Sequence, residues 1–148
     1  MGVTQMKKAA WIQAQRQKFA ARYDALLADL DWLATPHVPE GYEHGYQAYV
    51  CLFQPLEPTD ANVDRLHEWR NRVMMRLEER GVSTRQGTHA AHATGLYRQR
   101  GVKPEDCPIS LMAERISLAL PLFPTMTEAE QDYVVAELKA AFAAVEGG

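Results

Sequence analysis

Gly81-Val-Ser-Thr-Arg-Gln-Gly-Thr-His-Ala-Ala-His92 is the stretch around which the rest of the chain is organised. It begins with a short run typical of a β-strand, which carries Arg85, and continues through a glycine and a hydroxyl residue to two histidines three positions apart. An amphipathic helical pattern precedes this loop and a basic helical stretch follows it. We therefore expect the flanking segments to form the scaffold that holds the loop.

The composition fits one globular domain. The chain has 148 residues, of which 47% are hydrophobic and 24% charged, enough for a core of ordinary size. The net charge is -3 and the pI is near 5.9, so the chain does not have the excess of basic residues that is typical of nucleic-acid-binding proteins. No apolar run approaches the roughly 18 residues of a membrane span, and the first ten residues do not resemble a signal peptide. We expect a cytoplasmic protein that binds neither nucleic acid nor membrane, with Cys51 and Cys107 as buried thiols.

Two segments near the start of the chain have clear patterns. Residues 3–30 repeat apolar side chains at helical spacing. At about 1.5 Å per residue this helix would be roughly 40 Å long, the full width of a compact domain of this size. Residues 31–41, with two prolines, predict an extended connection, and residues 42–53 predict a strand that is apolar on both faces. The apolar stripe of the helix consists of Ile12, Phe19, Tyr23, Leu26 and Leu30.

The helix before the loop is expected to begin at Thr59 or Asp60, to run to Arg80 and to end at Gly81. After it, short strands are expected at 82–86 and 116–122.

Short helices are expected at 89–100 and 109–115. Thr127-Glu-Ala-Glu130 is a capping box that opens a last helix. The order predicts an α+β fold, with a small, mainly antiparallel sheet of about three strands packed by helices and a long N-terminal helix.

Arg85 has two interpretations. The planar guanidinium of arginine suits a carboxylate or phosphate, so Arg85 could bind an anionic ligand. The alternative is an ion pair with Glu78 or Glu79 at the end of the preceding helix.

His89 and His92 are spaced so that both imidazoles could face one side of a helical turn. A metal site needs a third ligand, and nothing in the sequence places Asp106 or Cys107 beside them, so we predict no metal. A histidine that faces a ligand and ordinary hydrogen-bonded histidines remain the alternatives. The sequence contains no G-x-S-x-G, Walker A or G-x-G-x-x-G motif and no complete catalytic set.

Several blocks together resemble the C-terminal part of the DegT/DnrJ/StrS-type aminotransferases, pyridoxal-phosphate enzymes that aminate keto sugars on nucleotide carriers. Residues 2–27 are similar to the helix that joins the large and small domains of that family, and residues 42–50 to the first strand of its small domain. Residues 72–85 resemble its helix ending in Gly-Ile-x-Thr-Arg. Residues 118–127 resemble its closing Leu-Ser-Leu-Pro and Pro-x-Met-Thr block, with Ala119 in place of the serine.

The resemblance implies a chain that is part of an enzyme. Residues 1–30 would be the interdomain helix and residues 31–148 the small domain of a fold type I aminotransferase. The Schiff-base lysine would lie in a large domain upstream, because none of the five lysines here lies in a block like the cofactor-lysine motif. We therefore expect a C-terminal domain, as a fragment or a separate chain, that is inactive alone and does not bind pyridoxal phosphate tightly. Its implied partners are the large domain, a nucleotide-sugar substrate and a second subunit of a homodimer.

The resemblance also implies that this domain walls the substrate entrance. The residues expected to contact the sugar nucleotide or the carboxylate of the amino donor are Arg85, Thr88, His89 and His92, with His44 as a weaker candidate. Many members have a tyrosine and prolines before the final histidine, where this chain has Thr88 and His89. A different hypothesis is a non-catalytic module that keeps the fold and binds a protein partner through its N-terminal helix.

Overall fold

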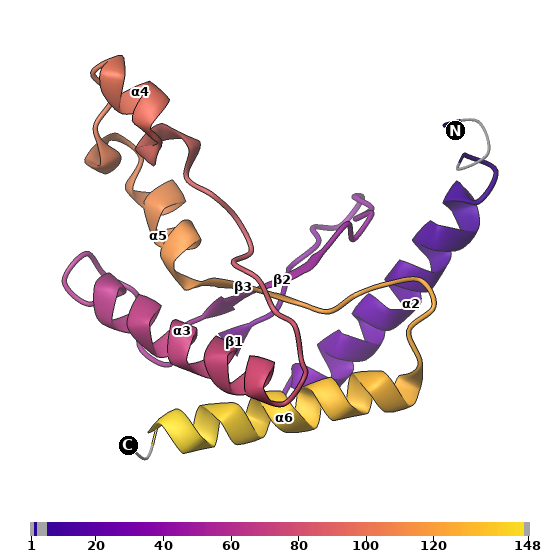
Figure 1. Ribbon diagram of the computed structural model, residues 1–148. Coiled ribbons are helices and arrows are strands. Elements are labelled where there is room, and N and C mark those ends of the chain that lie inside the picture. Colours follow the sequence, from indigo (N-terminus) through magenta and orange to yellow (C-terminus); the bar gives the residue numbers. More distant parts are fainter. Residues whose placement is uncertain (1, 3–5, 147–148) are drawn as a thin grey trace.

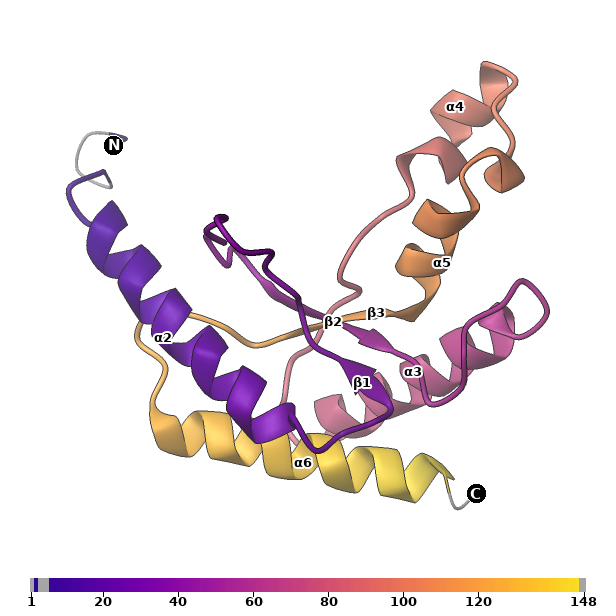
Figure 2. The same cartoon turned by 180° about the vertical axis from the view of Figure 1, so that it is seen from behind.

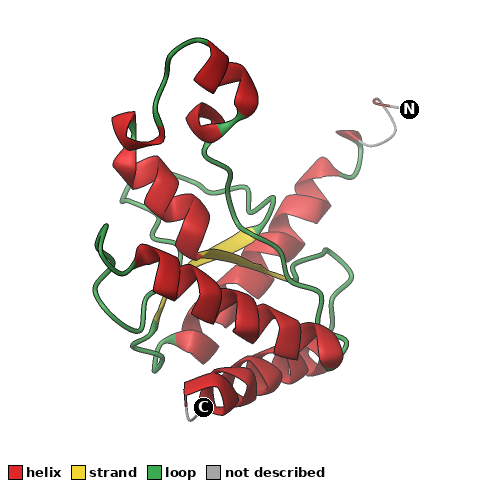
Figure 3. Cartoon of the chain, turned by 60° about the vertical axis from the view of Figure 1, so that its left-hand side comes forward, coloured by secondary structure: helices red, strands yellow, loops and turns green. Residues whose placement is uncertain are grey.

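The computed structural model describes residues 2 and 6–146, which form helices around a small sheet (Figure 1). The predicted α+β fold is confirmed, with three antiparallel strands in the order β1-β2-β3. Figure 3 shows this sheet surrounded by helices. The elements are α2 (Ala9–Leu27), β1 (Leu33–Ala34), β2 (Tyr49–Phe53), α3 (Val63–Glu79), α4 (Gly95–Gln99), α5 (Pro108–Ile116), β3 (Ser117–Leu120) and α6 (Glu128–Glu146), with 3₁₀ turns η1 (Ala91–Ala93) and η2 (Pro104–Asp106).

The number of strands was predicted correctly, but one strand was placed wrongly. Residues 82–86 are not a strand, because they contribute only an isolated bridge between Arg85 and Ala119. The third strand is β1, which lies in the segment expected to be an extended connection. The expected strand over 42–53 is also too long, since Tyr46 has a φ of 44° and leaves the extended region, so that β2 begins only at Tyr49.

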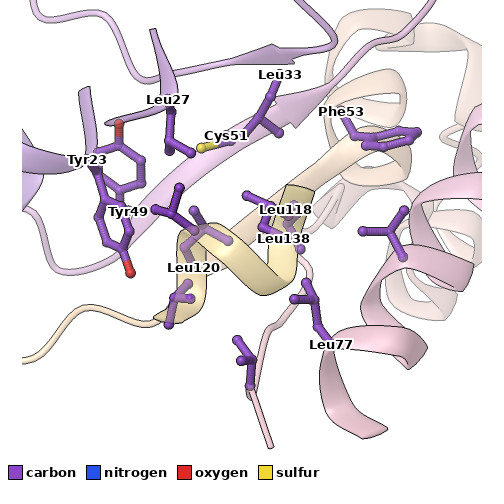
Figure 4. Close-up of a cluster of buried hydrophobic side chains, with 14 of the residues drawn as sticks. Tyr23, Leu27, Leu33, Tyr49, Cys51, Phe53, Leu77, Leu118, Leu120 and Leu138 are labelled. Atoms are coloured by element: carbon purple, nitrogen blue, oxygen red, sulfur yellow. The ribbon is translucent and has the colours of Figure 1, made fainter. Parts of the chain in front are cut away.

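The core lies on one face of β2. Tyr49, Cys51 and Phe53 alternate along the strand and are fully buried, packed against α2, α3 and α6. Figure 4 shows Tyr23 and the sheet residues converging on this cluster. Between β1 and α6, the ring of Trp32 stacks on that of Phe142 with centroids 4.0 Å apart.

The opposite face of β2 is covered too. Val50 and Leu52 are half-buried there, next to α5 and the segment around Gly87. The prediction of a strand covered on both faces is therefore confirmed for β2.

Two helix ends follow the sequence signals. Gly81 has a φ of +76°, and the N–H groups of Gly81 and Val82 donate to the carbonyls of Glu78 and Leu77, which closes α3 in a Schellman motif. The capping box of α6 is present, because the Glu130 carboxylate accepts from the Thr127 N–H and the Thr127 hydroxyl accepts from the Glu130 N–H.

The expected start of α3 at Thr59 or Asp60 was wrong. The helix begins at Val63, after a turn in which Asn62 Oδ1 accepts from the Thr59 N–H. Thr59 therefore joins this turn through its backbone, and its side chain does not cap the helix.

The N-terminal helix was predicted with the wrong bounds. Its expected start at Val3 lies outside the described residues, and within them α2 runs from Ala9 to Leu27 and not to Leu30. The chain turns at Leu30, whose N–H donates to the Leu27 carbonyl, because the backbone must reverse to enter β1. The apolar stripe packs into the core through Phe19 and Tyr23, whereas Trp11 is 51% exposed.

The expectation of two buried thiols holds for one of them. Cys51 lies in the core, where burial raises the pKa of its thiol to about 12. Cys107 is exposed, because it lies in the turn between η2 and α5 and not on an apolar face. In the part of the chain that the structure describes, no helix combines the length and apolarity needed to cross a membrane.

Candidate functional site

The segment from Arg85 to His92, called here the 85–92 loop, crosses the molecule from the end of α3 to an arm that carries α4 (Figure 1). The loop is bonded to β3 at its start, where the Arg85 N–H donates to the Ala119 carbonyl at 3.3 Å and the Ala119 N–H donates to the Arg85 carbonyl at 2.7 Å. Figure 2 shows the N-terminal half of α2 and the α4 arm extending away from the sheet on opposite sides, with the loop before β2 between them.

Gly87 and Thr88 are held by Ser117. The backbone N–H groups of Gly87 and Thr88 both donate to the Ser117 hydroxyl oxygen, each at 3.1 Å. The loop lies very close to the sheet here, because a Cβ atom on Gly87 would be 2.3 Å from Val50 Cγ1 and 3.0 Å from Ser117 Cβ. Any other residue would require a shift of the Val50 side chain or of the loop.

The loop is fixed again at Ala90, whose N–H donates to the carboxylate of Glu114 on α5. Behind Ser117, the buried Arg70 donates from Nη1 to the Ser117 carbonyl at 2.5 Å and lies with Nη2 2.9 Å from His67 Nδ1. Burial lowers the pKa of the Arg70 guanidinium, and the neighbouring charge of Arg115 acts in the same direction. The loop is therefore fixed to β3 and α5 at residues 85, 87, 88 and 90.

Arg85 is exposed beside a surface cavity of about 270 Å³ that is also lined by Gln47, Ser83 and Pro121. Among the described residues, no carboxylate forms an ion pair with Arg85. Of the two acidic residues proposed as partners at the end of α3, Glu79 pairs instead with Arg76 at 3.1 Å. The ion-pair interpretation of Arg85 was therefore wrong for the described residues, and Arg85 is instead joined to the sheet through its backbone bridge to Ala119.

The two histidines of the loop have different environments. His89 is exposed, with its Nδ1 3.1 Å from the Gln86 side-chain amide. His92 is 9% exposed, and its Nε2 lies 2.8 Å from the Pro104 carbonyl, so it connects the loop to η2. Within the described residues, no cluster of three or more histidine, cysteine, aspartate or glutamate side chains could hold a metal ion.

Thr88 and His44 complete the residues singled out from the sequence. Thr88 is exposed in the loop, held through its backbone. His44 lies in the loop before β2, where its Nδ1 accepts from the Tyr46 N–H at 2.9 Å and its carbonyl accepts from Gln17 on α2. Arg85, Thr88, His89 and His92 therefore lie on one loop, the first three exposed and His92 buried, and His44 lies on a separate loop.

Sequence reasoning missed the residues that hold the loop. Ser117 on β3, Glu114 on α5 and Arg70 on α3 carry no motif in the sequence. Their role depends on distances between elements that lie 24 to 47 residues apart in sequence. The one available signal was Gly87, because an internal glycine next to a strand often marks a close approach of two backbones.

The fold of this chain is similar to about a third of the chain in solved structures of aminotransferases. A solved structure of the aminotransferase TlmJ from Streptoalloteichus hindustanus superposes with a TM-score of 0.80 at 25% identity, and covers 97% of this chain and 35% of its own. The putative sugar aminotransferase Spr1654 from Streptococcus pneumoniae, with a TM-score of 0.84 and 18% identity, covers 99% of this chain and 34% of its own.

Residues 1–139 match the model of the DegT/DnrJ/EryC1/StrS aminotransferase family, so the chain belongs to that family. An uncharacterized protein of Methanocaldococcus jannaschii is 26% identical over 140 residues, which are 94% of this chain and 34% of that protein. The chain thus spans about a third of the length of the relatives it matches.

The family implies pyridoxal phosphate, and the described residues do not form a covalent site for it. Lys18 and Lys139 lie on the surface in ion pairs with Glu128 and Asp29. No lysine lines the cavity beside Arg85. The three remaining lysines, Lys7, Lys8 and Lys103, are exposed.

Proposed function

We propose that this chain is the C-terminal small domain of a pyridoxal-phosphate sugar aminotransferase, called here the parent enzyme, that moves an amino group from glutamate to a keto sugar on a nucleotide carrier. The family membership and the likeness to small domains of sugar aminotransferases support this proposal. When bound in the large domain, the cofactor supplies the amino-group transfer itself. The parent is proposed to be a cytoplasmic homodimer, and the chain alone is proposed to be inactive.

The role proposed for the domain is to bind the anionic part of a substrate at the 85–92 loop. The observation that carries this role is Arg85, which is exposed beside a cavity, has no carboxylate partner among the described residues, and has its backbone fixed to β3. An arginine in this state is available to a diphosphate or a carboxylate from outside the chain. Thr88 and His89 lie on the same loop and are proposed as further substrate contacts. His92 and His44 are weaker candidates for such contacts.

The experiment replaces Arg85 with alanine in the parent enzyme and uses Arg98→Ala as the matched control, since Arg98 is an exposed arginine on α4. A hydrogen bond to a charged ligand is worth about 1.5–3 kcal/mol, so kcat/KM for a nucleotide-linked keto sugar should fall about ten- to a hundredfold in Arg85→Ala. Arg98→Ala should stay within about twofold of wild type, because an exposed charge away from the ligand contributes little. Wild-type kcat/KM in a folded Arg85→Ala enzyme would contradict the proposed role.

A second test addresses inactivity of the isolated chain. The 148-residue chain is mixed with pyridoxal phosphate and borohydride, and adducts are located by mass spectrometry. We expect substoichiometric labelling spread over the exposed lysines. One saturable lysine together with turnover of glutamate would show that the chain carries its own cofactor site.

A further inference from the structure

We propose that Ser117 is a positioning residue for the 85–92 loop: its buried hydroxyl oxygen holds the backbone of Gly87 and Thr88, and thereby fixes the direction in which Arg85 and Thr88 meet a substrate. The part of this inference that concerns substrate rests on the proposed function. Ser117 itself is fully buried and touches no substrate.

The hydroxyl is fully used as an acceptor. Two consecutive backbone N–H groups, those of Gly87 and Thr88, donate to the same oxygen at 3.1 Å each. A serine hydroxyl has two acceptor lone pairs, so both are occupied by the loop. Successive N–H groups converge on one atom only for a restricted set of backbone angles, so this contact selects one conformation of the loop.

The acceptor is itself immobile. Ser117 is the first residue of β3 and is paired in the sheet with Leu52 of β2. Its carbonyl accepts from the Arg70 guanidinium, and Arg70 is only 1% exposed. Because the backbone of Ser117 is held by the sheet and by Arg70, its hydroxyl oxygen has a defined position, and the loop that bonds to it takes a defined position relative to the sheet.

Gly87 lies so close to the sheet that the loop has little room to move there. Because a Cβ on Gly87 would overlap the Val50 side chain, no other residue could lie this close to the sheet without a shift of that side chain or of the loop. The bonds to Ser117 also lie between the other two attachments of the loop. Residue 85 is bonded to Ala119 before them, and Ala90 is bonded to Glu114 after them. Without the hydroxyl, the Gly87 and Thr88 N–H groups would lose the acceptor that they have among the described residues.

Ordering of the 85–92 loop before the substrate binds should affect the kinetics. A loop that is already ordered does not lose conformational entropy when the ligand binds, whereas a loosened loop must be ordered at each binding event. Removal of the hydroxyl should therefore raise the KM for the substrate bound by this loop. A substrate bound elsewhere should be unaffected.

The first test is amide hydrogen exchange on the 148-residue chain, which needs no ligand. Ser117→Ala should speed exchange of the Gly87 and Thr88 amides by about tenfold or more, because a lost acceptor leaves them open to water. The amides of Leu77 and Leu138 in the core should keep their rates. Unchanged rates at Gly87 and Thr88, or an equal increase at the core amides, would overturn the positioning role. Ser110→Ala is the matched control, since Ser110 is an exposed serine on α5.

The second test measures kinetics in the parent enzyme with UDP- and dTDP-linked keto sugars. Ser117→Ala should raise KM for the sugar nucleotide about tenfold with kcat and the glutamate half-reaction within about twofold. Ser117→Thr, which keeps the hydroxyl oxygen, should recover most of the loss. If Arg85→Ala impairs the enzyme and Ser117→Ala does not, the positioning role is wrong. If Arg85→Ala has no effect, the proposed function of the loop fails instead.

Discussion

The hydroxyl of Tyr49 on β2 donates a hydrogen bond of 2.5 Å to Asp24 Oδ1 on α2. Tyr49 is fully buried, and burial, followed by this bond to a carboxylate, raises the pKa of its phenol. The ring also packs at 4.9 Å from that of Tyr23, whose own hydroxyl donates to the Pro121 carbonyl. These contacts join α2 to the sheet and to the segment after β3.

Tyr49→Phe should destabilise the protein because it leaves the half-buried carboxylate of Asp24 without its donor. A hydrogen bond to a charged group contributes about 1.5–3 kcal/mol, against about 0.5–1.5 kcal/mol for a neutral pair. Urea unfolding should therefore show a larger loss of stability for Tyr49→Phe than for the matched Tyr23→Phe, in which the acceptor left without a donor is a carbonyl. An equal loss in both variants would mean that the carboxylate adds nothing to the bond.

The two histidines of the loop should respond differently to replacement by alanine. His92 is buried against the Pro104 carbonyl, so His92→Ala should lower the free energy of unfolding by about 1–3 kcal/mol. His89 is exposed, so His89→Ala should leave stability within about 0.5 kcal/mol of wild type. In the parent enzyme, His89→Ala should instead lower kcat/KM for the sugar nucleotide. Thermal unfolding and steady-state kinetics on both variants check this contrast, and equal stabilities would contradict it.

The sequence was sufficient for the features that depend on local chemistry. Helical spacing predicted α3 and α6, the Thr127–Glu130 pattern predicted a real capping box, and Gly81 ended α3. The order of the expected elements predicted the α+β fold, and the family resemblance, carried by short motifs along the chain, implied the same fold. These signals lie within a few residues of one another, so they can be recognised without knowledge of packing.

The sequence was insufficient where pairing between distant residues decides the outcome. Residues 82–86 have a strand-like composition, yet a single bridge to Ala119 forms because the chain must leave the sheet to bring Gly87 onto Ser117. The two residues of β1 have no pattern of their own and pair because they lie opposite the end of β2. The same limit applies to Arg85, which bridges to Ala119 on β3, a residue 34 positions further along the chain.

Acid should weaken the start of α6. The pKa of Glu130 is lowered by its hydrogen bonds from the Thr127 backbone and hydroxyl, so the folded state favours the ionised carboxylate. A lowered folded pKa contributes stability above the unfolded value of 4.5 that is lost as the pH falls through the folded pKa. Glu130→Gln should therefore remove part of the stability loss between pH 5 and about pH 3, measured by urea unfolding at each pH. An unchanged pH profile would show that the cap does not depend on charge.

The exposed part of α2 gives the last prediction. Trp11 is 51% exposed and Ile12 half-buried on a helix whose later turns enter the core. Exposed apolar surface of this kind marks an interaction site. The site would bind the proposed large domain or, if the chain is a non-catalytic module, a protein partner. The expected consequence is self-association of the isolated chain through the segment from Val3 to Ile12, of which residues 3–5 lie outside the described part.

Sedimentation velocity over a range of concentrations measures this association. Trp11→Glu should shift the chain to monomer, because a carboxylate cannot be buried in an apolar contact without a partner. Ile109→Glu is the matched control, since Ile109 is 76% exposed on α5. A wild-type chain that stays monomeric at high concentration, or that is dispersed equally by both changes, would show that α2 is not the contact. If the large domain is then supplied as a separate chain, it should bind wild type and not Trp11→Glu, because both partners would use the same face of α2.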